Sequence, residues 1–127
     1  MSELPFEISG SKAGTPIVLV PGGLSGWVSW RPHAEVLSKN HQVLRVQLLN
    51  MAAAEKQQTP SKNYSLRSES EALKNTLYKL KIDKIHLVGW SHGGEVSLDF
   101  ALNHLTLGRV ALCRALLTDS HGEQADA

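Results

Sequence analysis

Cysteine and long apolar runs are scarce in this chain, and no block of like charge stands out. The single cysteine, Cys113, excludes an internal disulfide and is typical of a reducing compartment. A formal net charge of +1 without a basic block gives no reason to expect nucleic acid or an anionic membrane as a partner. No apolar run approaches the roughly 20 residues that span a bilayer, and the N-terminus lacks the apolar stretch of a signal peptide. We therefore expect a soluble, cytoplasmic protein.

The composition is that of an ordinary globular protein. Apolar residues make up 42% and charged residues 20% of the 127 residues. A chain of this length suffices for one modest domain with one hydrophobic core. The sequence contains neither internal repeats nor a low-complexity tract, so we expect a single domain over 1–127.

Short apolar segments alternate with segments of helical periodicity. The run Ile-Val-Leu-Val at 17–20 is typical of a parallel strand that is buried on both faces. The alternation predicts an α/β protein with a mostly parallel sheet, right-handed crossovers and helices on both faces of the sheet. The strands are expected at 6–9, 17–20, 41–49 and 84–88, and the helices within 25–40, 68–82 and 93–104.

The segment 68–82 has the clearest helical pattern. Ser68 and Glu71 have the spacing of a capping box, which predicts the start of the helix at this point. Residues 50–63 are polar and are expected to form a long loop, with at most a turn of helix at their Ala-Glu-Lys centre. The leucines of the helical segment fall on one face: Leu66, Leu73, Leu77 and Leu80.

A Gly-x-Ser-x-Gly pentad at 89–93 follows directly on an expected strand. A serine hydroxyl is a poor nucleophile unless a base removes its proton and a pocket holds the resulting oxyanion. A sharp strand-to-helix turn would lift Ser91 above the sheet and aim the N-terminus of the next helix at the developing charge. The amide of His92 would then donate one oxyanion-hole hydrogen bond. Gly89 and Gly93 are expected because a Cβ at either position would collide with the neighbouring element.

Three stretches together resemble the N-terminal half of the α/β hydrolase fold, of the esterase, lipase, haloperoxidase-like and C–C hydrolase kind. They are Ile-Val-Leu-Val-Pro-Gly-Gly at 17–23, Trp27 with Trp30-Arg31-Pro32, and the segment 84–104 around the pentad. The resemblance covers about residues 6–104. It implies acyl transfer by a nucleophilic serine on an ester-like or other small carbonyl substrate, with no cofactor. A serine in this place argues against the epoxide-hydrolase and dehalogenase branches, which use an aspartate.

The resemblance also implies how the site is assembled. The strand before Pro-Gly-Gly and the strand before the pentad would be neighbours, so their C-terminal ends would bring the Pro-Gly-Gly loop beside the serine. Gly23 or Leu24 would supply the second oxyanion amide. Relatives usually have His-Gly where this chain has Pro21 and a glycine. Because the donor is a backbone amide, this departure affects the shape of the pocket more than the oxyanion hole.

The remaining histidines have no spacing that predicts a metal centre. No pair of them has a metal-ligand spacing together with a carboxylate, so no metal is expected. His86 lies within an expected strand and is interpreted as a core or interface residue. His33, His41 and His104 lie near the ends of expected elements and are interpreted as surface residues.

The tail 105–127 is atypical of the family. Relatives place the catalytic acid and then the histidine after the serine, and here Asp119 and His121 are the candidates for that acid and base. A histidine two residues after the acid would have to fold back across the serine. The tail has three interpretations: a displaced sixth strand, an amphipathic helix over 105–117, or unrelated sequence produced by truncation or a reading-frame change.

Two main readings of function stay open, together with a third. The first is a serine hydrolase acting on a small molecule, and the second is a non-catalytic remnant or interaction module without the histidine. In the third, a partner chain completes the sheet and supplies the histidine in trans. A sheet that ends in a flat apolar strand invites pairing with another chain, which predicts a homo-oligomer formed through the sheet edge.

Overall fold

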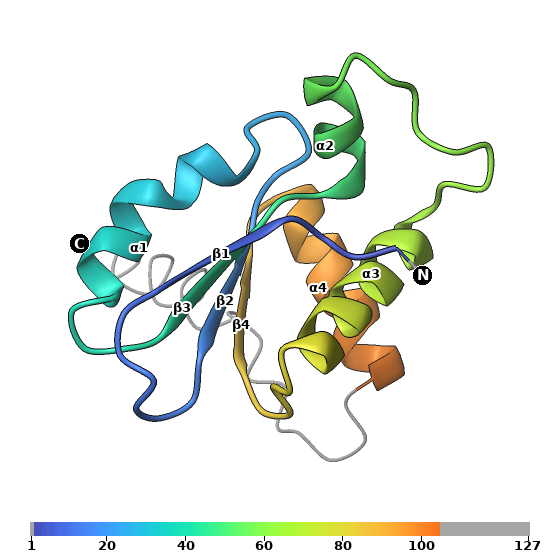
Figure 1. Ribbon diagram of the computed structural model, residues 1–127. Helices are drawn as coiled ribbons and strands as arrows, with labels where there is room; N and C mark the ends of the chain where they lie inside the picture. Colours follow the sequence, from blue (N-terminus) through green and yellow to red (C-terminus); the bar gives the residue numbers. More distant parts are fainter. Residues whose placement is uncertain (1, 105–127) are drawn as a thin grey trace, which may run out of the picture.

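A computed structural model describes residues 2–104, which form a four-stranded sheet with helices on both faces (Figure 1). The strands are β1 (Phe6–Ser9), β2 (Ile17–Val20), β3 (Val43–Val46) and β4 (His86–Gly89), in the spatial order β1-β3-β2-β4. The pairs β2–β3 and β2–β4 are parallel, whereas β1 runs antiparallel to β3. The α/β class, the mostly parallel sheet and the neighbouring positions of β2 and β4 are therefore confirmed.

The helices are distributed over the two faces of the sheet. The 3₁₀ helix η1 (Trp27–Trp30) continues into α1 (Arg31–Leu37), which carries proline in its first turn. Further along the chain come α2 (Leu49–Glu55), α3 (Leu66–Lys79) and α4 (His92–His104). Figure 1 shows α1 on one side of the sheet and α3 and α4 on the other. None of the described helices is long and apolar enough to cross a membrane.

Apolar side chains form a separate core on each face. The larger core joins α3 and α4 to β2 and β3, and its buried side chains include Val18, Val20, Leu44, Val46, Leu73, Leu77, Val96 and Phe100. The smaller core joins α1 to the opposite face through Leu19, Ala34 and Val43. Alternate residues of β2 thus serve different cores, which is the reason for its uninterrupted apolar sequence.

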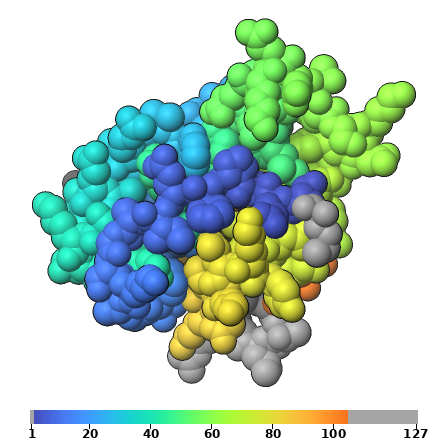
Figure 2. All heavy atoms as spheres, viewed as in Figure 1, coloured from blue at the N-terminus to red at the C-terminus, as the bar shows by residue number. Residues whose placement is uncertain are grey.

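Two local expectations were wrong. Helix α3 begins at Leu66, because the Ser65 hydroxyl accepts the Ser68 amide at 3.3 Å and the Ser68 hydroxyl accepts the Ser65 amide at 3.0 Å. Ser68 is therefore the third residue of the helix and not its cap. The expected loop at 50–63 instead starts with helix α2, and the stretch between α2 and α3 protrudes at the upper right of the molecule (Figure 2).

The turn between β4 and α4 packs so closely against the end of β2 that no side chain fits between the two backbones. A Cβ on Gly93 would lie 2.3 Å from the carbonyl oxygen of Pro21 and 2.4 Å from that of Val20. A Cβ on Gly89 would lie 2.4 Å from the Gly93 carbonyl oxygen. Real Cβ atoms do not approach backbone atoms this closely, so both positions require glycine on the grounds of space.

An ion pair joins the exposed sides of α3 and α4. The Asp99 carboxylate accepts hydrogen bonds from Arg67 at 2.9 Å and 3.2 Å, and from the Ser70 hydroxyl. The hydrogen bonds from Arg67, and secondarily from Ser70, lower the pKa of Asp99. Protonation of Asp99 therefore weakens the contact between the two helices.

The Gly93→Ala substitution is expected to lower the free energy of unfolding by roughly 2 kcal/mol or more, because backbone atoms on β2 leave no room for a methyl group. Gly94→Ala is a matched control in the same helical turn, since its Cβ would lie 3.8 Å from the Gly89 carbonyl oxygen, an ordinary van der Waals distance. The control is expected to be neutral or to gain up to about 1 kcal/mol from helix propensity. Urea unfolding curves measure both. Equal losses in the two variants would contradict the packing argument.

Acid is expected to destabilise the parent chain more than its Asp99→Asn variant. A lowered pKa in the folded state gives a stabilisation that is present above the usual value of about 4 and is lost as the pH falls through the folded value. Urea midpoints at pH 6, 5, 4 and 3 measure this difference. Ser70→Ala, which removes one donor, is expected to fall between the two. Parallel pH profiles for the parent and Asp99→Asn would rule out this linkage.

Candidate active site

The pentad forms a sharp turn between β4 and α4. Ser91 is exposed and has a φ of 55°, a left-handed conformation that non-glycine residues seldom adopt. Its carbonyl accepts the amides of Gly94 at 2.8 Å and Glu95 at 3.2 Å, which starts α4. The serine therefore lies at the positive end of the α4 dipole, where negative charge is stabilised.

The Pro-Gly-Gly loop lies directly against this turn. A Cβ on Gly22 would be 3.5 Å from the Ser91 Cβ and 3.3 Å from the Trp90 ring. A Cβ on Gly23 would be 3.5 Å from the His92 Cβ. The Leu24 side chain is 98% exposed. The structure thus brings both glycines of the loop to the serine turn, as the parallel β2–β4 pair requires.

The His92 ring is turned toward two polar groups. Its Nε2 lies 3.5 Å from the Tyr64 hydroxyl, and its Nδ1 lies 3.7 Å from the Glu95 carboxylate. The Tyr64 hydroxyl donates to Glu69 at 2.7 Å, so it presents its lone pairs to His92. Tyr64 therefore links the turn after Ser91 to helix α3.

Glu69 is a fully buried carboxylate on α3. It accepts the backbone amides of Leu49 at 2.8 Å and Asn50 at 3.2 Å, in addition to the Tyr64 hydroxyl. Burial, and then the hydrogen bond to Glu69, raise the pKa of Tyr64. The carboxylate thus satisfies the first amides of α2 and provides the physical reason for a helix where the sequence predicts a loop.

Strand β3 holds the far end of the Pro-Gly-Gly loop. Arg45 donates to the Trp27 carbonyl at 3.1 Å, and the Trp27 amide donates to the side chain of Gln47 at 3.2 Å. Arg45 of β3 and Gln47 directly after the strand are both buried, with exposures of 8% and 1%. The loop is therefore fastened at Trp27 as well as packed at its glycines.

Of the predicted site residues, the structure brings together Gly23, Gly89, Ser91, His92 and Gly93, whereas Leu24 is exposed to solvent. Asp119 and His121 lie outside the described residues. His33 and His41 are exposed, as predicted. His86 is exposed on β4, so it is not a core residue. His104 is not a surface residue: its side chain is 13% exposed, 3.4 Å from Glu71, and packs on Phe100.

The sequence contains signals for the polar residues that were missed. Glu69 falls three residues after Leu66 and four before Leu73, on the apolar face of α3, where an acid implies a buried partner. Arg45 and Gln47 are two residues apart in an otherwise apolar strand and so share one face. No comparable signal predicts that Tyr64 reaches His92, because that contact depends on the path of the loop before α3.

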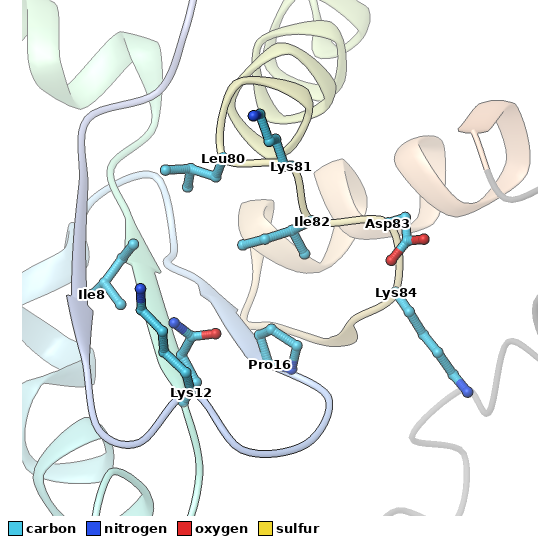
Figure 3. A pocket seen from close by; sticks show the side chains of 9 residues that line it. Ile8, Lys12, Pro16, Leu80, Lys81, Ile82, Asp83 and Lys84 are labelled. Carbon is cyan, nitrogen blue, oxygen red and sulfur yellow. The ribbon is translucent and has the colours of Figure 1, made fainter.

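A cavity among the described residues lies elsewhere. It has a volume of about 410 Å³ and is lined by Ile8, Lys12, Pro16, Gln42, Leu80, Lys81, Ile82, Asp83 and Lys84 (Figure 3). Pro16 and Gln42 precede β2 and β3, so this cavity lies at the opposite end of the strands from Ser91. In parallel sheets, sites lie at the carboxyl ends of strands, which favours the Ser91 end. Residues 2–104 contain no cluster of three side chains suited to a metal ion.

Known proteins resemble this chain over part of their length. The chain is 33% identical over 93 residues to a 2-hydroxy-6-oxo-2,4-heptadienoate hydrolase from Pseudomonas putida, covering 71% of this chain and 33% of that protein. It is 30% identical over 101 residues to the putative carbamate hydrolase RutD from Azorhizobium caulinodans, covering 80% and 36%. The chain thus spans about a third of the length of these curated relatives.

The solved structures and the family comparison agree with the described sheet. MGS-M2, an α/β hydrolase enzyme from a Medee basin deep-sea metagenome library, superposes with a TM-score of 0.69 at 29% identity, over 81% of this chain and 37% of that one. The sequence profile of the α/β hydrolase fold matches residues 15–125. Because this profile matches most of the chain, and because β2 and β4 pair next to the serine turn, the chain belongs to the α/β hydrolase fold family.

Proposed function

We propose that Ser91 is the nucleophile of a hydrolase that acts on an ester-like or other small carbonyl substrate. The observation that carries this proposal is the backbone of Ser91, which is held at a φ of 55° between β4 and α4. Such a conformation persists only where the surroundings impose it, and here the close packing of Gly89 and Gly93 does so. The turn leaves the serine exposed at the end of the sheet and at the positive end of a helix.

The backbone amide of His92 and that of Gly23 or Leu24 would hold the oxyanion. When the Ser91 oxygen attacks the carbonyl carbon, the carbonyl oxygen takes up negative charge and needs two preorganised donors. The contact between Gly23 and His92 supports the first of the two loop positions. Collapse of the tetrahedral intermediate would release the alcohol, and water would then release the acyl group from Ser91.

The serine also needs a base, and Asp119 and His121 are proposed as the acid and base within this chain. The ring nitrogens of His92 face Tyr64 and Glu95, an arrangement that favours an orienting role for His92 and not proton transfer from Ser91. This orientation also supports the second candidate function, a non-catalytic module that keeps the turn but lacks the base. In a third arrangement, a second chain supplies the histidine through a sheet-edge contact.

The similar curated proteins support a small-molecule substrate. One is named for 2-hydroxy-6-oxo-2,4-heptadienoate and another, putatively, for a carbamate. Both names denote hydrolysis of a bond at or beside a carbonyl group, which is compatible with a serine nucleophile and an oxyanion hole. The proposed steps involve only side chains, backbone amides and water.

Hydrolysis of p-nitrophenyl acetate tests the proposal. The parent chain is expected to release p-nitrophenol above the buffer rate, and Ser91→Ala is expected to remove the whole of this excess. Ser11→Ala, which changes an exposed serine away from the site, is expected to keep the parent rate. Equal rates in the parent and Ser91→Ala would refute the nucleophile. A folded parent chain at the buffer rate would favour the non-catalytic module, and a rate per chain that rises with concentration would indicate a histidine supplied in trans.

A further inference from the structure

Both backbone groups of Trp27 are held by side chains, one from β3 and one from Gln47 directly after it. The Trp27 carbonyl accepts from Arg45 at 3.1 Å, and the Trp27 amide donates to Gln47 at 3.2 Å. Arg45 and Gln47 are separated by one residue, so their side chains project from the same face of the strand. Two buried polar side chains on one strand are thus directed at a single peptide segment of the neighbouring loop.

That segment closes the turn that carries the proposed oxyanion donors. The Gly26 amide donates to the Gly22 carbonyl at 3.2 Å, which places Gly23 and Leu24 at the tip of the turn. Gly26 has a φ of 64°, and a Cβ on it would lie 3.0 Å from the side-chain nitrogen Nε2 of Gln47. The turn therefore lies tightly on Gln47 and ends directly before Trp27, the residue that Arg45 and Gln47 hold.

Arg45 and Gln47 each have a second partner. Arg45 forms an ion pair with Glu7 directly across the β1–β3 ladder and lies 5.8 Å from the centre of the Trp27 ring. The Gln47 amide nitrogen donates to Glu55 of α2 at 2.9 Å, so its oxygen faces the Trp27 amide. The Gln47 oxygen also accepts the Leu48 amide at 3.2 Å. Helix α2 thereby takes part in fixing the turn, while Glu7 of β1 compensates the charge of the buried Arg45.

We propose that Arg45 and Gln47 are positioning residues that set the distance between the Gly22–Gly26 turn and Ser91. This inference rests on the proposed function, because it matters for catalysis only if the turn supplies an oxyanion donor. Neither side chain touches the reacting atoms. A buried guanidinium on a sheet is costly to desolvate, and here it is compensated by a carboxylate and a backbone carbonyl. The burial of these two polar side chains is thus explained by their hydrogen bonds to Trp27.

The first test measures the turn itself. Gln47→Leu removes the acceptor of the Trp27 amide, and Arg45→Met removes the donor to the Trp27 carbonyl. Hydrogen–deuterium exchange of the Gly26 and Trp27 amides is expected to become about tenfold faster in each variant, the effect of losing about one net hydrogen bond. Glu7→Gln is the matched control, since it removes the ion pair but leaves the bond from Arg45 to Trp27. It is expected to exchange like the parent at these two amides.

The rescue variant swaps the residues at positions 47 and 55. The double change Gln47→Glu with Glu55→Gln keeps an acceptor for the Trp27 amide and reverses the direction of the bond to α2. It is expected to restore the parent exchange rates, which a general loss of stability would not do. If Gln47→Leu does not fold, Arg45→Lys decides. Different guanidinium nitrogens of Arg45 contact Trp27 and Glu7, and a lysine has one nitrogen that pairs preferentially with the carboxylate, so faster exchange of the Trp27 amide is expected.

The second test measures catalysis with the p-nitrophenyl ester. Gln47→Leu and Arg45→Met are expected to lower kcat at least about tenfold while KM changes less than about twofold, because a displaced donor acts on the transition state. The inference would be overturned if both variants showed the amide exchange rates of the parent. It would also be overturned if the parent is active and the variants exchange faster but keep the parent's kcat, since the turn would then not serve catalysis. Faster exchange in a chain without Ser91-dependent hydrolysis would confirm the anchoring and refute the proposed function instead.

Discussion

The arrangement of the described residues depends on one close backbone contact, that of Gly93 with the carbonyl oxygens of Val20 and Pro21. This contact requires that β4 pair with β2, that the chain turn sharply after Gly89, and that α4 start at once. The left-handed backbone of Ser91 follows from the same requirement. A side chain at Gly93 would push the serine turn away from the end of β2 and from Pro21, where the Pro-Gly-Gly loop begins.

Buried polar side chains arrange the segments around this contact. Glu69 satisfies the first amides of α2 and orients Tyr64 toward His92, while Arg45 and Gln47 hold Trp27. These groups are costly to bury, and each is compensated by backbone amides, carbonyls or an opposite charge. They connect segments that are distant in the sequence. The resulting network surrounds the serine on the side of α2 and of the loop after β2.

The fold was largely predictable from the sequence, because its signals are local. The apolar run at 17–20 and the pentad after a strand predict β2, β4 and the serine turn, and the spacing of leucines predicts α3. The sequence predicts only a loop with a turn of helix where α2 forms, because the first amides of α2 are satisfied by Glu69, twenty residues away. The contact between Tyr64 and His92 was missed for a similar reason: it depends on tertiary packing that no local pattern encodes. The roles of Asp119 and His121 stay predictions, since both lie outside the described residues.

The central claim is that this backbone contact presents an activated serine. Reaction of the purified chain with a fluorophosphonate probe tests it most directly, with intact-mass and peptide mass spectrometry beside a Ser91→Ala variant. The account predicts a single adduct, located on Ser91 in the parent chain and missing from the variant, because only an activated hydroxyl displaces fluoride at a useful rate. A folded parent chain that remains unmodified, or a variant that is modified equally, would contradict the account.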